Sequence, residues 1–275
     1  MNRTYGIYHV SEIFPDIYRI ENSHVFMDLI VGTHHALLWD TGYGYADLGE
    51  VIREITQLPL YVVNSHGHLD HACGNWQFHE VYIHPDDMVL CREHNSPHTR
   101  MLELSAAELP EHFDREAHLH RGHGCLRPVQ EGDSFDLGGK ILEAVSLPGH
   151  TAGSIGLFCK EMRLIYLGDA ANDFVWLFLP EAQQLSVYRS TLRKLDSMEF
   201  DWMVQSHCPQ VLPKARLKWY IDLVDHLDYP SGQIVPPPIE TGIEARICIR
   251  GGLTLADRGR EDFAAILIGR DKFNL

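Results

Sequence analysis

One six-residue segment of this chain holds four side chains that can bind metal ions: His66-Gly67-His68-Leu69-Asp70-His71. It directly follows the apolar run 60–63, which is typical of a short buried strand. Imidazole nitrogen is a favoured ligand of zinc and similar divalent ions, and a carboxylate lowers the net charge of a site with two cations. Because Gly67 permits a tight turn, the two halves of the segment can point toward two neighbouring positions. The segment therefore predicts a site for two metal ions.

Three further candidate ligands stand at the ends of short apolar runs that are typical of strands. They are His150, Asp169 and His207. Residues at the ends of neighbouring strands meet at one edge of a sheet, which is where clefts form. We therefore expect these three side chains to join the segment 66–71 around one site.

The order of these motifs resembles the metallo-β-lactamase superfamily, in which His-x-His-x-Asp-His is followed by Pro-Gly-His-Thr, Gly-Asp and a single His. Asp40, in Trp39-Asp40-Thr41-Gly42, is similar to that superfamily's first motif. The resemblance implies that Asp40 supports the metal-binding loop without binding metal itself. It also implies two ligand sets with one shared residue: His66, His68 and His150 for one metal; Asp70, His71 and His207 for the other; and Asp169 bridging them.

The resemblance implies an α/β (α+β) fold, a four-layer αββα sandwich in a single domain over residues 1–275. Apolar periodicity predicts strands at 17–20, 25–31, 36–39, 81–83 and 154–159, and helices at 45–57, 182–196 and 214–227. Residues 86–124 show helical spacing and no strand signal, so we expect a helical cap inserted over the cleft. Residues 230–275 form a C-terminal extension, with a stiff connector at Pro236-Pro237-Pro238 and a strand pair at 244–249 and 263–268. This strand pair completes a sheet edge or forms a homodimer contact.

Two cations held close together favour hydrolysis. A water molecule that bridges them loses its proton near neutral pH and becomes a hydroxide nucleophile, while one cation polarises the attacked oxygen. We expect two divalent ions, zinc in the first place, with iron or manganese as alternatives. Asp70 is expected to act in catalysis by accepting a hydrogen bond from the bridging water, in addition to binding metal. The expected substrate is a small ester, thioester or lactone with an apolar part.

An aromatic run follows Asp169 and contains Phe174, Trp176 and Phe178. These rings either pack in the core or line an apolar substrate pocket beside the metals. Glyoxalase II enzymes of the superfamily carry Gly-Cys-Gly-Arg at this place, so its absence argues against glutathione thioesters. Lactonases of the family use a tyrosine near the metals, and neither Tyr166 nor Tyr188 can be assigned that role from the sequence.

Two other activities remain open. Persulfide dioxygenases resemble this chain in motif and bind a single iron through the positions that match His66, His150 and Asp169. Phosphodiesterases and nucleases of the superfamily are a further alternative, although extra segments that grip RNA or DNA are not evident here. A non-catalytic binding protein would be expected to lose ligands, and all seven positions are filled.

The composition favours an enzyme that acts on small molecules. A formal net charge of −15 repels phosphate backbones, so nucleic acid is not an expected partner. The six cysteines form no Cys-x-x-Cys pair, and no apolar stretch has the length of a signal peptide or a membrane span. We therefore expect a cytoplasmic protein that does not bind membranes. His118, His120 and His123 are not expected to bind metal, because no carboxylate or cysteine is suitably placed with them.

Overall fold

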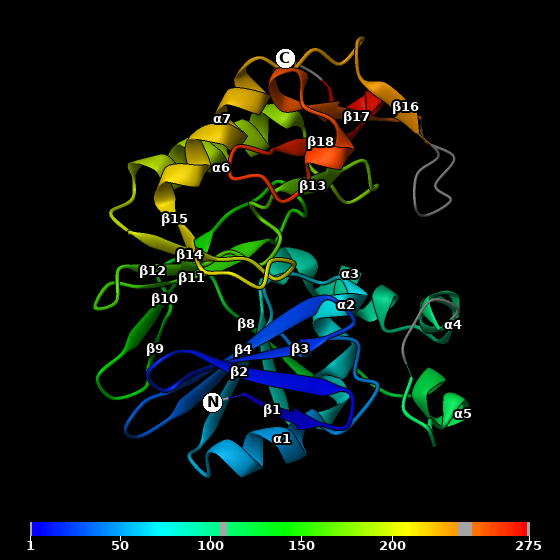
Figure 1. Cartoon of the computed structure of the whole chain (residues 1–275). Coiled ribbons are helices and arrows are strands. Elements are labelled where there is room, and N and C mark those ends of the chain that lie inside the picture. The colour runs from blue at the N-terminus through cyan, green and yellow to red at the C-terminus, as the bar shows by residue number, and fades with distance from the viewer. Residues whose placement is uncertain (1, 105–108, 236–243, 274–275) are drawn as a thin grey trace.

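The computed structural model describes residues 2–104, 109–235 and 244–273. The first of its three sheets has eight strands, which follow one another in chain order (Figure 1). They are β1 (Asn2–Tyr5), β2 (Tyr8–Phe14), β3 (Ile17–Asn22), β4 (Val25–Val31), β5 (Ala36–Trp39), β6 (Leu60–Val63), β7 (Glu80–Ile83) and β8 (Cys125–Pro128). Neighbours are antiparallel from β1 to β5 and parallel from β5 to β8. β1 and β2 are absent from the predicted strands, because β1 is polar and mostly exposed and the apolar residues of β2 are interrupted by His9, Ser11 and Glu12.

The second sheet has six strands in the order β15-β14-β12-β11-β10-β9. They are β9 (Ser134–Asp136), β10 (Ile141–Ser146), β11 (Ile155–Cys159), β12 (Leu164–Tyr166), β14 (Trp202–Val204) and β15 (Leu212–Pro213). The two sheets pack face to face through a buried cluster that includes Trp39 and Val63 from the first sheet and Leu157 and Tyr166 from the second. This cluster forms the centre of the sandwich.

Helices cover the outer face of each sheet. α1 (Leu48–Ile55) packs against the first sheet, and α6 (Leu185–Ser197) and α7 (Leu217–Asp225) pack against the second. The predicted four-layer αββα sandwich is therefore confirmed. The predicted helix 45–57 is too long at its start, because the Asp47 side chain accepts a hydrogen bond from the Glu50 backbone N–H and so caps the helix there.

A third sheet adds a layer that the sequence did not indicate (Figure 1). It contains β13 (Phe174–Leu177), β16 (Gln233–Val235), β17 (Ala245–Ile249) and β18 (Ala265–Gly269), in the order β13-β18-β17-β16. One face packs on α6 and α7, since Ile266 and Ile268 share a buried cluster with Leu192 and Tyr220. β17 and β18 form the expected antiparallel pair, and β13 joins it in parallel with β18. The predicted connector at 236–238 lies outside the described residues.

Between β7 and β8, the described residues form short helices joined by turns and irregular stretches, with no strand. They are α3 (Met88–His94), α4 (Pro97–Glu103) and α5 (Arg115–Leu119), while the segment 66–71 runs into the short helix α2 (Leu69–Ala72). In Figure 1, α4 and α5 project to one side of the sandwich. Among the helices of the described ranges, none has the length and apolar character needed to cross a lipid bilayer.

Candidate metal centre

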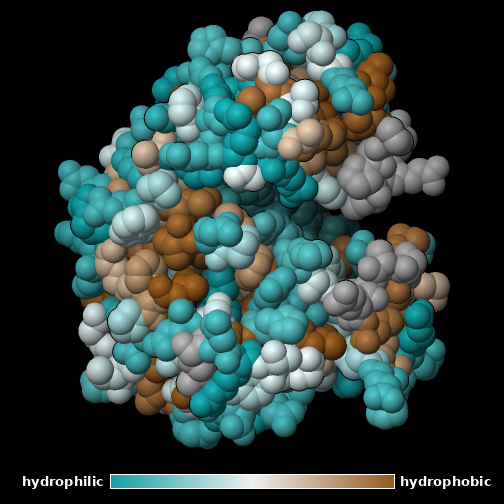
Figure 2. Space-filling view, viewed as in Figure 1, coloured by the Kyte–Doolittle hydropathy of each residue, from teal (hydrophilic) through white to brown (hydrophobic). Residues whose placement is uncertain are grey.

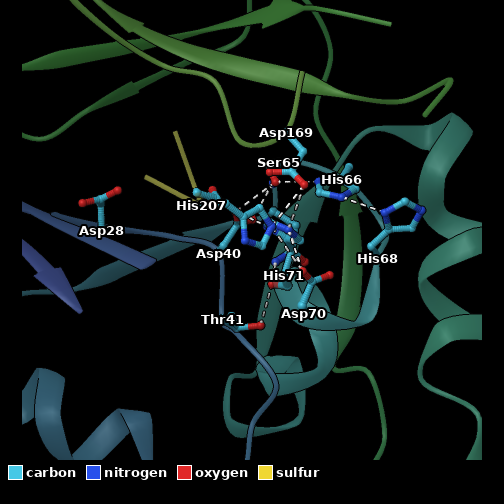
Figure 3. Close-up of polar contacts among 12 residues, drawn as sticks. Asp28, Asp40, Thr41, Ser65, His66, His68, Asp70, His71, Asp169 and His207 are labelled. Atoms are coloured by element: carbon cyan, nitrogen blue, oxygen red, sulfur yellow. Dashed lines mark hydrogen bonds and ion pairs between the residues drawn. The ribbon is translucent and has the colours of Figure 1, made fainter. Parts of the chain in front are cut away.

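The structure brings all seven predicted ligands together at one end of the two central sheets. Segment 66–71 follows β6, and the three distant residues follow β10, β12 and β14 in the second sheet. Their nitrogen and carboxylate atoms form overlapping groups that could each hold a metal ion: His66, His68 and His150; His66, His71 and Asp169; Asp70, His71 and His207. Figure 3 shows most of these side chains converging from the two sheets.

Three imidazole nitrogens meet on one side of the centre. His68 Nδ1 lies 3.1 Å from His66 Nε2 and 2.9 Å from His150 Nε2. Zinc–nitrogen bonds of about 2.0–2.1 Å in a tetrahedron separate two ligand nitrogens by about 3.3 Å, close to these distances. This set has the spacing of ligands to one ion.

Two carboxylates and two imidazoles form the other side. Asp70 Oδ2 lies 3.3 Å from His71 Nε2 and 3.4 Å from His207 Nε2. Asp169 Oδ2 lies 3.2 Å from His207 Nε2 and 3.8 Å from both His71 Nε2 and His150 Nε2. Asp169 therefore stands between the two sets, the position that the bridging role requires. Gly168 permits its approach, because a Cβ there would lie 2.5 Å from Ser65 Cβ.

In each of the five imidazoles, the ring nitrogen that points away from the centre forms a hydrogen bond that fixes the ring. The partners of these outer nitrogens are Ser65 Oγ for His66, Glu181 Oε1 for His68, Asp40 Oδ2 for His71, the Trp176 carbonyl for His150 and the His24 carbonyl for His207. A hydrogen bond at one ring nitrogen leaves the lone pair of the other free to bind a metal. All five inner nitrogens face the centre in this way.

Asp40 connects the two sheets behind the centre. Its carboxylate accepts hydrogen bonds from the Ser65 backbone N–H at 2.7 Å, the Ser65 hydroxyl at 2.9 Å and His71 Nδ1 at 2.9 Å. The Ser206 hydroxyl, next to His207, also donates to it at 3.3 Å. Asp40 therefore contacts the metal-binding loop and not the inner face of the centre, in the place that the sequence resemblance implies.

Asp87 and Arg19 hold two further loops, and the sequence offers no local signal for either. Asp87 Oδ2 accepts hydrogen bonds from the Gly67 N–H at 2.9 Å and the Thr151 hydroxyl at 2.7 Å, which joins the metal-binding loop to the loop of His150. Gly67 serves this close approach, since a Cβ there would lie 2.8 Å from the Asp87 carbonyl. Arg19 donates to the carbonyls of Gln205 and Cys208, both at 2.6 Å, and so holds the loop of His207.

The protonation states suit a cation at the centre. Burial, together with neighbouring imidazoles, lowers the pKa of His66 well below its usual range and that of His150 to about 4, so both are neutral. Burial lowers the pKa of His207, but Asp169 and Asp70 raise it by more, to about 10. The carboxylates of Asp70 and Asp169 therefore stabilise a positive charge beside them.

The donor set fits divalent metal ions. His71 Nε2 and Asp169 Oδ1 are buried and have no hydrogen-bond partner among the described residues. Buried polar atoms normally have a partner, and a metal ion would supply one for both. Neutral imidazole nitrogens and ionised carboxylates are also the forms that ligate divalent metals.

A cleft of about 700 Å³ opens above the centre. Asp70, Asp169 and His207 line its floor, and Phe174, Trp176 and Leu179 line an apolar wall. Figure 2 shows the surface hollowed there, between the upper and lower parts of the view. The structure corrects one expectation, because Phe178 is fully buried in a cluster with Leu267 and does not line the cleft. Along β13, Phe174 and Trp176 point to one side.

Other residues near the cleft lie outside the predicted site. The ring of His94 stacks on His68 with centroids 5.0 Å apart, and Tyr43, just after the Asp40 motif, lines the cleft. Tyr166 and Tyr188 are both buried in hydrophobic clusters. His118, His120 and His123 belong to none of the candidate metal groups found among the described residues. The sequence could have indicated Tyr43 as a cleft residue, because it directly follows the motif of Asp40, whereas no motif in the sequence indicated His94.

A family model described as the metallo-beta-lactamase superfamily matches residues 25–207. The chain belongs to this superfamily. The match spans every predicted ligand, from the start of β4 to His207 itself. Solved structures agree at the level of the fold. A metallo-beta-lactamase from Erythrobacter litoralis aligns with a TM-score of 0.58 at 14% identity, over 82% of this chain and all of the other. One from Pontibacter korlensis aligns with a TM-score of 0.55 at 16% identity, over 80% and 99%.

Relatives with similar sequences are named as thioesterases or as hydroxyacylglutathione hydrolases. The acyl-coenzyme A thioesterase MBLAC2 of Gallus gallus is 29% identical over 61% of this chain and 64% of its own length, somewhat under two thirds. The human protein of that name is 25% identical over 74% and 77%. The hydroxyacylglutathione hydrolase of Roseobacter denitrificans is 25% identical over 54% of each chain. The prediction of a metal-dependent hydrolase is thereby confirmed at the level of the enzyme class.

Proposed function

We propose that this protein hydrolyses acyl thioesters with two divalent metal ions, zinc in the first place, bound by the seven ligands named above. The observation that carries the proposal is the convergence of five imidazole nitrogens and two carboxylates at a cleft with an apolar wall, which His68, His150 and His207 line together with both carboxylates. The named thioesterases among the similar sequences support the choice of bond.

The chemistry needs a water nucleophile and a polarised carbonyl. Divalent ions bound to this set would lower the pKa of a water molecule and polarise the thioester carbonyl. Asp70 lines the cleft, and although burial raises its pKa, His71 and His207 lower it by more, well below its usual range. Its ionised carboxylate can therefore accept a hydrogen bond from the attacking water and orient it. The thiol product has a pKa of roughly 8.5, so a thiolate can leave without a strong acid beside it.

The cleft wall and the cap supply contacts for the acyl part. Phe174, Trp176 and Leu179 offer an apolar surface at the centre. Leu102 and Glu103 of α4 also line the cleft. We include the segment 86–124 in the proposal as a cap that contributes to substrate specificity, within a single domain.

The test is turnover by protein loaded separately with zinc, iron or manganese. The substrates would be acyl-coenzyme A esters of several chain lengths, S-lactoylglutathione, a lactone, a β-lactam and a phosphodiester. We expect thioester hydrolysis at a rate well above that of the other bonds, and its loss in His150→Ala. Cleavage of the phosphodiester alone would refute the proposal. Oxygen consumption with a persulfide by the iron-loaded protein, without thioester hydrolysis, would refute it in favour of a dioxygenase.

A further inference from the structure

The loop between β17 and β18 places one cation at the cleft. Arg258 is the only lysine or arginine among the described residues that line it. Its guanidinium lies over the Phe174 ring, 5.8 Å from the centroid, and the side chain is exposed to solvent. Arg258 therefore stands where the apolar wall meets the cleft mouth.

The neighbouring arginines of this loop already form ion pairs within the protein. Arg250 and Arg260 both pair with Asp262, at 3.1 and 2.9 Å. Asp257, next to Arg258, accepts hydrogen bonds from the backbone and hydroxyl of Thr254 instead. Within the described ranges Arg258 forms no ion pair, so its charge is available to a ligand.

The cleft acid that stands next to Phe174 is also occupied. Asp173 Oδ1 accepts hydrogen bonds from Arg216 at 2.8 Å and from the Tyr220 hydroxyl at 2.5 Å. The Arg258 guanidinium lies over the Phe174 ring at the cleft mouth and has no carboxylate partner among the described residues, so it is suited to bind an anionic group of a ligand.

We propose that Arg258 binds a phosphate group of the carrier thiol, so that the substrates are acyl thioesters of phosphorylated thiols such as coenzyme A. This inference rests on the proposed function. With a net charge of −15, the chain repels anionic molecules on average, so a phosphorylated substrate needs a local positive charge. Guanidinium binds phosphate through paired hydrogen bonds. The acyl chain would then lie along Trp176 and Leu179 toward the floor of the cleft.

The experiment compares Arg258→Ala with Arg260→Ala, an exposed arginine of the same loop that pairs with Asp262 and does not line the cleft. Binding of desulfo-coenzyme A and of uncharged desulfopantetheine to the metal-loaded protein is measured by titration calorimetry. Turnover is measured with acetyl-coenzyme A, with the neutral acetyl-N-acetylcysteamine, and with a succinyl-N-acetylcysteamine that carries its anion on the acyl part.

We expect Arg258→Ala to weaken the binding of desulfo-coenzyme A about tenfold and to leave the affinity for desulfopantetheine unchanged. Tenfold is the low end for a charge-assisted contact, because the site is exposed to solvent. KM for acetyl-coenzyme A should rise by the same factor at constant kcat, while Arg260→Ala stays native. Equal binding by both variants, or a selective effect on the succinyl substrate, would overturn the assignment. If the native protein hydrolyses no thioester, the proposed function fails, and the binding titration still decides the role of Arg258.

Discussion

Replacing Asp40 by Asn changes one atom behind the metal centre and keeps the volume of the side chain. In the native protein its two oxygens accept hydrogen bonds from four donors, the Ser65 N–H, the Ser65 hydroxyl, the His71 Nδ1–H and the Ser206 hydroxyl, and the side chain is fully buried. An amide has only one oxygen, so at least one donor faces an NH₂ group. If that donor is His71 Nδ1, the ring takes its proton at Nε2, which blocks the lone pair toward Asp70.

The expected loss has two parts. One buried donor without an acceptor costs about 1–3 kcal/mol of unfolding free energy. Loss of a partner behind a metal ligand lowers metal affinity about 10- to 100-fold. Because Asp40 contacts His71 directly and reaches the three-histidine set only through the Ser65 hydroxyl beside His66, the ion of the set with His71 should be affected most.

The assay is a stepwise zinc titration against a competing chelator, with cobalt spectra to distinguish the two coordination sets. Glu181→Ala is the matched control, since Glu181 Oε1 holds His68 Nε2 at 2.7 Å and should weaken the other ion. Native affinity for both ions in Asp40→Asn, or loss of the same ion in both variants, would contradict the reasoning.

Three other perturbations test different parts of the structure. Removing metal with a chelator should lower the melting temperature, because a ligand at 100 times its Kd stabilises by about 2.7 kcal/mol; an unchanged melting curve would argue against metal binding. Asp87→Ala leaves the Gly67 N–H and the Thr151 hydroxyl without their acceptor and should cost about 3 kcal/mol in urea unfolding, whereas a cost under about 1 kcal/mol would show that water replaces it. Trp176→Ala should raise KM about tenfold for thioesters with long acyl chains and little for acetyl thioesters, because Trp176 lines the cleft. Phe178→Ala should lower the free energy of unfolding by about 3–5 kcal/mol, because Phe178 is buried. If thioester assays and thermal unfolding instead show the KM effect in Phe178→Ala and the stability loss in Trp176→Ala, the assignment of the two side chains is wrong.

The ligand set of the centre was readable from the sequence. His66 to His71 carry their chemistry within six residues, and His150, Asp169 and His207 each end a short apolar run. The residue type of a ligand and its position at the end of an apolar run are local properties of the sequence, so both can be recognised before the fold is known. The central sandwich was predictable for the same reason and through the superfamily resemblance.

Only the tertiary structure decided how the ligands are supported and what lines the cleft. The aromatic run 174–178 is apolar on both faces, so its pattern cannot tell which side chains are covered. Pairing of β13 with β18, about ninety residues later in the chain, buries Phe178 and leaves Trp176 at the cleft. Glu181 and Arg258 likewise stand in no motif, because their roles depend on contacts between segments far apart in sequence. The candidate ligands are thus recognisable from local sequence, whereas the contacts that support them and the residues that line the cleft depend on packing between distant segments.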